Sequence, residues 1–278
     1  MAKQFFNLIL IILLCTACTN SKLSNKNNDS IPTVQQWEIL NKEGIEFYKK
    51  GNVKKAQQYI KKSLDIAKKT FGKDSLETAT SLNNLAEISR TNGDLPRAEK
   101  EYKASLEIRS KKLGKNDPIT ITTINNLAAI YFALGKYNQS EKLFKDTIAS
   151  LEITLKDEDP TLMLLLSNLA QLYRYEKKYL ESEAIYKRLL NATQNMTTGK
   201  DLVYASVLND LGAIYFLQGK FNEAKECFET SVPILEEKLG ENNAQLDIIY
   251  ENLTQVYNKL GNKDKASYFN NKLMSMPL

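Results

Sequence analysis

The sequence predicts an all-α fold in which six similar helical hairpins follow one another along the chain. Three observations lead to this prediction. Glycine and proline are scarce, certain glycines recur at differences of 42, 42, 84 and 42 residues, and apolar residues repeat with helical spacing. The recurring glycines are Gly51, Gly93, Gly135, Gly219 and Gly261, and Lys177 occupies the place of the missing member.

Each 42-residue unit is expected to hold two helices joined at its glycine, because a helix end of this kind needs the positive φ that glycine tolerates. Caps are expected at the start of the first helices, from Asp74, Asp117, Asp159 and Asp201. The first helices are predicted over residues 35–50, 76–92, 118–134, 160–176, 202–218 and 243–260. The second helices are predicted over residues 53–70, 95–113, 137–155, 179–195, 221–239 and 263–274.

Small and large apolar residues recur in the same order in every unit. A small residue in the first helix recurs at Gly44, Ala86, Ala128, Ala170, Gly212 and, less well, Thr254. A second small residue recurs at Ala56, Ala98, Ser140, Ser182, Ala224 and Ala266. Four residues further on, a large one recurs at Ile60, Tyr102, Phe144, Tyr186 and Phe228, with Asn270 breaking the series. The small residues mark places where a neighbouring helix is expected to approach closely.

This order of leucine, small residue and tyrosine, then alanine and an aromatic residue, resembles the tetratricopeptide repeat (TPR). The strings LNNLAEI, INNLAAI and SNLAQLY and the 42-residue period are most similar to its kinesin-light-chain-like subclass. The resemblance covers about residues 35–275 and implies an alpha-alpha superhelix, a TPR solenoid whose first helices line the concave side. The TPR domain is expected over residues 35–278, with repeats at about 35–75, 76–117, 118–159, 160–201, 202–243 and 244–276.

The N-terminal segment predicts export and lipid anchoring. Lys3 precedes a short apolar run, which is typical of a secretory signal peptide over residues 1–17. Thr16-Ala17-Cys18 resembles a bacterial lipobox, which implies lipidation of Cys18; Cys15 is the rival acceptor, and an ordinary secretory signal is the other alternative. Residues 18–34 then form a lipidated flexible tether spanning about 20–24 Å. The expected location is the bacterial cell envelope, with the outer membrane favoured by Thr19, facing the periplasm or the surface.

A row of polar residues on the first helices is the candidate binding face for a protein or peptide partner. Asparagine amides donate and accept, so a ladder of them can hold an extended peptide backbone. The alternative is that these amides bond to neighbouring repeats. The row comprises Asn83, Asn84, Asn125, Asn126, Asn168, Gln171, Arg174, Tyr175, Asn209, Asp210, Asn252 and Gln255. It has no lysine at positions 41, 83, 125, 167, 209 and 251, so binding of C-terminal carboxylates by a lysine clamp is not expected.

Six lysines at seven-residue spacing predict a basic face on the second helix of the first hairpin. This face could meet an anionic membrane surface, and the plainer alternative is a solvated outer face. Nucleic acid is not expected as a partner, because the protein is predicted to be exported and has no interleaved aromatic platform. The lysines are Lys54, Lys55, Lys61, Lys62, Lys68 and Lys69.

Nothing in the sequence predicts catalysis, a cofactor or a metal site. The chain contains no histidine and no glycine-rich phosphate loop, although a glycosidase that uses two carboxylates alone stays open. Cys227 is expected on a partly exposed helix face as an unreactive thiol. The predicted function is therefore that of a non-catalytic, membrane-anchored scaffold for protein–protein interaction. Assembly of envelope complexes is the expected process. A peptide or glycan sensor and an anionic membrane-surface binder are the alternatives.

Overall fold

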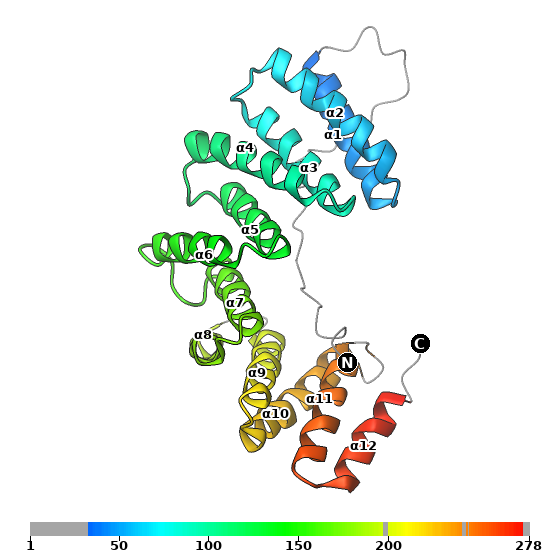
Figure 1. Ribbon diagram of the computed structural model, residues 1–278, viewed down its shortest axis with the longest axis vertical. Helices are drawn as coiled ribbons and strands as arrows, with labels where there is room; N and C mark the ends of the chain where they lie inside the picture. Colours follow the sequence, from blue (N-terminus) through cyan, green and yellow to red (C-terminus); the bar gives the residue numbers. More distant parts are fainter. Residues whose placement is uncertain (1–32, 197–199, 241–242, 244, 275–278) are drawn as a thin grey trace. The chain divides into compact units, whose positions relative to one another are not determined.

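The computed structural model describes residues 33–196, 200–240, 243 and 245–274, and within this part of the chain it contains twelve α-helices and no strand (Figure 1). The predicted all-α fold is confirmed. The first helices of the hairpins are α1 (Thr33–Lys49), α3 (Leu76–Thr91), α5 (Pro118–Ala133), α7 (Pro160–Tyr175), α9 (Lys200–Leu217) and α11 (Gln245–Lys259). The second helices are α2 (Val53–Thr70), α4 (Leu95–Leu113), α6 (Tyr137–Leu151), α8 (Tyr179–Gln194), α10 (Phe221–Leu239) and α12 (Lys263–Met274).

Several helix boundaries differ from the prediction, most of them by one or two residues and the end of α6 by four. Helix α1 begins at Thr33, so two residues assigned to the tether belong to its first turn. The start of α1 is held in place because the Trp37 indole donates to Ser81 Oγ at 2.9 Å and its ring packs against Phe71. Helix α6 was expected to reach residue 155 but ends at Leu151, whose carbonyl accepts from the backbone N–H of Leu155 at 2.8 Å in a turn.

The caps of the first helices are partly as predicted. Asp117 accepts from the N–H of Ile119 at 2.8 Å and Asp159 from that of Thr161 at 2.8 Å, and a proline occupies the first turn of each helix. The prediction was wrong for Asp74, because the cap of α3 is Ser75, which accepts from Thr78 N–H at 3.1 Å. It was also wrong for Asp201, which lies inside the first turn of α9. A carboxylate is still favourable there, next to free backbone N–H groups.

The turns between the two helices of each hairpin confirm the predicted role of the recurring glycines. Their φ angles lie between 72° and 79°, in the left-handed region. Lys177, which replaces glycine in the fourth hairpin, adopts φ 61° and is the only non-glycine residue in the described chain with a positive φ. The next residue, Lys178, donates its N–H to Tyr173 C=O at 2.8 Å, which is the bond that closes this kind of helix end.

The chain divides into two compact units, with the boundary in the sequence between Ser140 and Glu141, and each is described by itself. In the first unit, the core of the first hairpin lies where α2 packs against α1 and α3. A Cβ added at Gly44 would lie 2.5 Å from Ile60 Cδ1, so the helices approach closely at the predicted small residue. The buried residues of this cluster are Ala56, Ile60, Leu64, Leu85 and Ile88.

The second unit repeats this packing. A Cβ added at Gly212 of α9 would lie 2.8 Å from the Phe228 ring of α10, so glycine again allows a close approach. Phe228 belongs to a core cluster that α11 completes with Leu246, Tyr250 and Leu253. None of the helices in the described part of the chain is long and apolar enough to cross a membrane.

Candidate protein-binding face

The polar row of the first unit is largely engaged in bonds between repeats. Asn84 Nδ2 on α3 donates to Asn41 Oδ1 on α1 at 2.9 Å. Asn83 Oδ1 accepts from Arg109 of α4 and Thr123 of α5, each at 3.4 Å. Asn125 and Asn126 on α5 are buried. The structure therefore supports the alternative prediction, that amides tie neighbouring repeats together, for Asn83 and Asn84.

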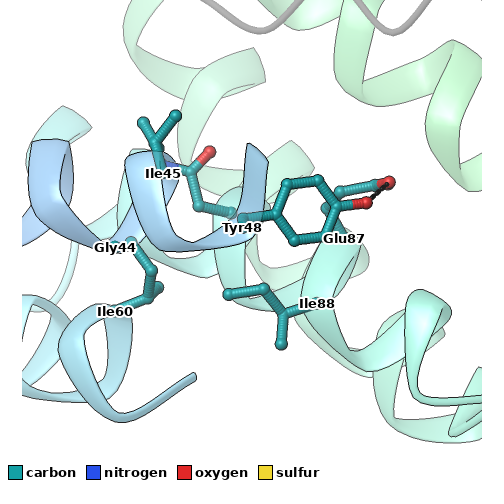
Figure 2. Close-up of a pocket in the computed structure, with 7 residues that line it drawn as sticks. Gly44, Ile45, Tyr48, Ile60, Glu87 and Ile88 are labelled. Carbon is teal, nitrogen blue, oxygen red and sulfur yellow. Dashed lines mark hydrogen bonds between the residues drawn. The ribbon is translucent and has the colours of Figure 1, made fainter. Parts of the chain in front are cut away.

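A shallow hollow in the first unit lies beside Asn84 and is shown in Figure 2. It has about 240 Å³ of space, part of it open solvent, and Gly44 leaves room because it has no side chain. Its polar wall is Glu87, whose carboxylate accepts from Tyr48 Oη at 2.8 Å and Tyr102 Oη at 2.9 Å. Its other lining residues are Ile45, Ile60 and Ile88.

Glu87 is held as a carboxylate by its neighbours. Burial by itself raises the pKa of Glu87, but the Arg90 guanidinium and the two tyrosine hydroxyls outweigh burial, and the pKa is lowered. Arg90 donates from Nε at 3.0 Å and from Nη2 at 2.5 Å. Because every oxygen of this carboxylate already accepts a bond, the cluster stabilises the link between α1, α3 and α4. The sequence analysis did not single out Glu87.

In the second unit, α7 presents four of the predicted residues at helical spacing. Asn168, Gln171 and Arg174 are half-buried, and the Tyr175 ring is 45% exposed. Positions i, i+3, i+6 and i+7 lie on one helix face, so these side chains form one contact surface. We call Asn168, Gln171, Arg174 and Tyr175 the α7 face. An exposed tyrosine beside an arginine is a composition typical of binding hot spots.

The polar row continues on α9 and α11. Asn252 Nδ2 on α11 donates to Asn209 Oδ1 on α9 at 3.3 Å, which repeats the bond between Asn84 and Asn41. Gln255 Nε2 donates to Glu251 Oε1 of its own helix at 3.3 Å. Two of the predicted amides thus tie α9 to α11, as the alternative prediction described.

Asp210 on α9 is the acidic member of the row and is half-buried. Burial raises the pKa of the Asp210 carboxyl to about 6, although Arg174 and the Tyr186 hydroxyl oppose this rise. No carboxylate–guanidinium pair within 4.0 Å joins Asp210 to Arg174 among the described residues. The buried Tyr186 hydroxyl makes no well-formed hydrogen bond to any of the described residues. Arg174 of the α7 face and Asp210 of α9 therefore carry opposite charges that no direct ion pair joins.

Sequence analysis missed a second repeated feature, a set of inter-repeat clusters of one glutamate, two lysines and one tyrosine. In one of them, Glu183 of α8 accepts from Lys187 Nζ at 2.6 Å and from Lys220 Nζ at 2.9 Å, and both ammonium groups lie over the Tyr215 ring. The equivalent clusters are Glu99, Lys103, Tyr131 and Lys136, and Glu141, Lys145, Tyr173 and Lys178. The glutamate-to-lysine spacing of four residues, recurring every 42, was the signal that could have revealed them.

Cys227 differs from its prediction. It is buried in α10 rather than partly exposed, because it packs towards the core beside Phe228. Burial raises the pKa of the Cys227 thiol to about 11, so the thiol stays protonated and unreactive near neutral pH. Within the described residues, no group of three or more Cys, Asp or Glu side chains could hold a metal ion. Cys15 and Cys18 lie outside the residues that the structure describes.

Stacked hairpins with a polar row on their first helices define a helical-repeat protein of the interaction type. The tetratricopeptide repeat family matches residues 40–99, 82–153, 161–237 and 203–276, and the chain belongs to this family. Proteins with these repeats are generally non-catalytic scaffolds for protein–protein interaction. A search of curated proteins found no match.

Solved structures confirm the likeness to kinesin-light-chain-type repeats. One similar structure is that of the nearly identical TPR-like repeats of a candidate kinesin light chain from Podosopora anserina, which is 20% identical to this chain with a TM-score of 0.65. The match covers 76% of this chain and 99% of that one. BtubC (BKLC) from P. vanneervenii shares 19% identity, with a TM-score of 0.64 and coverage of 88% and 90%. Pseudomonas aeruginosa pilF shares 15% identity, with a TM-score of 0.60 and coverage of 87% and 91%. At these identities the likeness shows the fold alone.

Proposed function

We propose that this protein is a membrane-anchored, non-catalytic scaffold that holds a protein or peptide partner on the α7 face of its polar row. The observation that carries the proposal is the α7 face, with Asp210 of α9 beside it. The fold supports binding of a protein partner. The face combines amides, an arginine and a 45% exposed tyrosine, which together suit an extended peptide or a partner helix.

The site of action that we propose is the bacterial envelope, where the scaffold contributes to assembly of a larger complex. The lipobox-like Thr16-Ala17-Cys18 supports this location, with the outer membrane favoured. The structural likeness to pilF, and to PilW, a type IV pilus biogenesis factor with 17% identity and a TM-score of 0.62, is consistent with such a role. That likeness is one of fold, so the partner is left to experiment.

The binding face is tested with the variant Gln171→Ala/Arg174→Ala on α7. Affinity capture from detergent-solubilised envelopes would identify a stoichiometric partner of the wild-type protein. We expect the variant to bind that partner at least tenfold more weakly, because truncation of a hot-spot arginine costs about 2 kcal/mol or more. The control is Asn222→Ala/Glu226→Ala, which removes two exposed polar residues from the second helix α10. Equal capture by both folded variants would exclude the α7 face.

The anchor is tested separately by metabolic labelling with a radioactive fatty acid. Cys18→Ala is expected to abolish the label, and Cys15→Ala is expected to retain it. Labelling that persists in Cys18→Ala and disappears in Cys15→Ala would move the anchor to the other cysteine. If the wild-type protein is not labelled, the segment is an ordinary secretory signal and the proposed lipidation is wrong.

A further inference from the structure

The outer surface of α2 is a basic face that the proposed scaffold function does not use. Its six lysines are all exposed, whereas the opposite side of α2 is buried against α1 and α3. At 1.5 Å per residue the lysines extend over about 23 Å of the helix. We call this surface the lysine face, and its members are Lys54, Lys55, Lys61, Lys62, Lys68 and Lys69.

The lysine face is not neutralised by the protein itself. Within the described residues, none of its six ammonium groups lies within 4.0 Å of a carboxylate. Second helices elsewhere behave differently: Lys103 and Lys111 on α4 each pair with a glutamate four residues earlier, at 2.5 and 2.6 Å. The same spacing on α2 joins Lys69 to Asp65, and these two form no pair within 4.0 Å among the described residues.

The lysine face also lies next to the point where the N-terminal segment joins the fold. Trp37 in the first turns of α1 packs against Phe71, which directly follows α2, with ring centroids 5.8 Å apart. Lys68 and Lys69 in the last turn of α2 are therefore close to the start of α1. If Cys18 carries the anchor, a flexible coil of the 14 residues between it and α1 would span about 19–22 Å. Such a reach would allow the lysine face to contact the membrane surface.

The chemistry of the face favours a phosphate-bearing membrane surface over a folded partner. Lysines present compact charges on flexible stems, so they follow a fluid array of phosphates and do not require one fixed geometry. Of the six lysines of the face, Lys55 alone lies over an aromatic ring of the described residues, that of Phe47, so the face offers no exposed aromatic platform to stack bases. We propose that the lysine face docks the first hairpin onto anionic phospholipid headgroups of the phosphatidylglycerol type. The orienting role of this contact rests on the proposed anchor.

The proposal is tested by flotation of the full chain with two kinds of vesicle, phosphatidylcholine alone and phosphatidylcholine mixed with phosphatidylglycerol. Any insertion of the N-terminal apolar segment contributes to both, so the ratio of the two partition coefficients reports the lysine face. We expect the ratio to exceed one clearly at low salt. It should fall towards one at about 1 M salt, where the screening length is about 3 Å. A wild-type ratio of one at low salt overturns the proposal.

Charge variants locate the contact on the molecule. Each lysine near an anionic surface raises binding about fivefold, so Lys68→Gln/Lys69→Gln should lower the ratio by up to about 25-fold. The matched control is Lys111→Gln/Lys112→Gln, which removes two exposed lysines from the last turn of α4. The control should keep the wild-type ratio. An equal fall in both variants would make the effect one of net charge and overturn the proposal.

The remaining outcomes separate this proposal from the anchor and from other partners. The Cys18→Ala chain should keep its preference for anionic vesicles while losing the lipid label, so failure of the anchor does not remove the signal. Salt-sensitive retention on poly-glutamate beads, without flotation on anionic vesicles, would assign the lysine face to an acidic protein and overturn the membrane assignment. Retention on duplex DNA beads alone would overturn it in favour of nucleic acid.

Discussion

At the scale of single residues, Asp210 is the only acidic member of the polar row, whose other members are mostly amides. The equivalent places in four of the other repeats hold Asn84, Asn126, Asn168 and Asn252, and the first repeat has Lys42 there. A buried amide keeps its hydrogen bonds without carrying charge, whereas a carboxylate must lose water. The raised pKa of Asp210, about 6, reports that cost. A natural substitution that costs stability beside the α7 face fits a role in binding, because functional sites often tolerate such costs.

Replacing Asp210 by asparagine should stabilise the protein by about 1–3 kcal/mol at pH 7, because a raised carboxyl pKa penalises the folded state when the group is charged. The sign follows from linkage. The penalty is fully present above the folded pKa of about 6, and it is lost as the pH falls through 6 towards the unfolded value of about 3.9. Urea unfolding across this range measures it. A difference between variant and wild type that stays constant from about pH 8 to 4 would show that charge is not the cause.

Lys177 carries the other local cost, a left-handed backbone at a non-glycine residue. Lys177→Gly should raise the free energy of unfolding by about 0.5–1 kcal/mol. The gain is limited because glycine also makes the unfolded chain more flexible. The midpoint of urea unfolding measures the change. Lys177→Ala is the control, since alanine has the same difficulty with φ 61° and should bring no gain. Stabilisation by alanine as large as that by glycine would exclude backbone strain.

At the scale of elements, neighbouring hairpins are joined by charged clusters as well as by apolar packing. Glu183 on α8 accepts from Lys187, Lys220 and Gln218, so it links its own helix to the end of α9. Burial raises the pKa of Glu183, but the two lysines and the amide outweigh it and lower the pKa to about 2. Between the fifth and sixth hairpins, Glu229, Tyr257 and Lys265 combine the same three residue types. Tyr257 keeps the 42-residue register, whereas Glu229 and Lys265 lie at shifted positions. The link is therefore maintained although the sequence register changes.

Glu183→Gln should lower the free energy of unfolding by about 1–3 kcal/mol at pH 7, because two ammonium groups lose their carboxylate. The wild-type stabilisation is present above the unfolded pKa of about 4.3 and is lost as the pH falls towards 2. The variant should therefore approach the wild type in acid. The control Glu226→Gln removes an exposed carboxylate of α10 and should change stability by less than about 0.5 kcal/mol. Equal losses in the two variants would contradict a specific role for the cluster.

At the scale of the whole molecule, a repeat protein is held together by contacts between neighbours. Within each unit, the helices pack against those of their own hairpin and of the adjacent one. Stability is then a sum of hairpin and interface contributions, and local damage need not spread to distant hairpins. The two compact units in the chain are consistent with such local behaviour.

Phe228→Ala should show this locality. Phe228 is fully buried in the core that α9, α10 and α11 share, so its loss should cost about 3–5 kcal/mol. Hydrogen exchange read by mass spectrometry should accelerate in α9–α12 and stay unchanged in α1–α4. Uniform acceleration in all twelve described helices would show instead that the molecule unfolds as one cooperative body.

The sequence by itself determined the repeat, the hairpins and most helix ends. These depend on signals that lie close together in the chain: an apolar period of 3.6, an aspartate before a proline, and a glycine at a left-handed turn. Asp74 and Asp201 show the limit of such signals, because Ser75 offered an alternative cap and α9 begins before Asp201. The N-terminal anchor and the identity of the binding residues stay predictions.

Only the tertiary structure decided what the polar residues of the repeat do. The sequence left open whether Asn84 and Asn252 bind a partner or a neighbouring repeat, and the structure shows that they donate to the preceding repeat at 2.9 and 3.3 Å. Asp210 differs from them by one atom, and its raised pKa follows from burial beside Arg174 and Tyr186. The fate of a polar side chain depends on which groups the next hairpin brings within about 3 Å of it. Residues 42 positions apart supply those groups, and local patterns do not contain them.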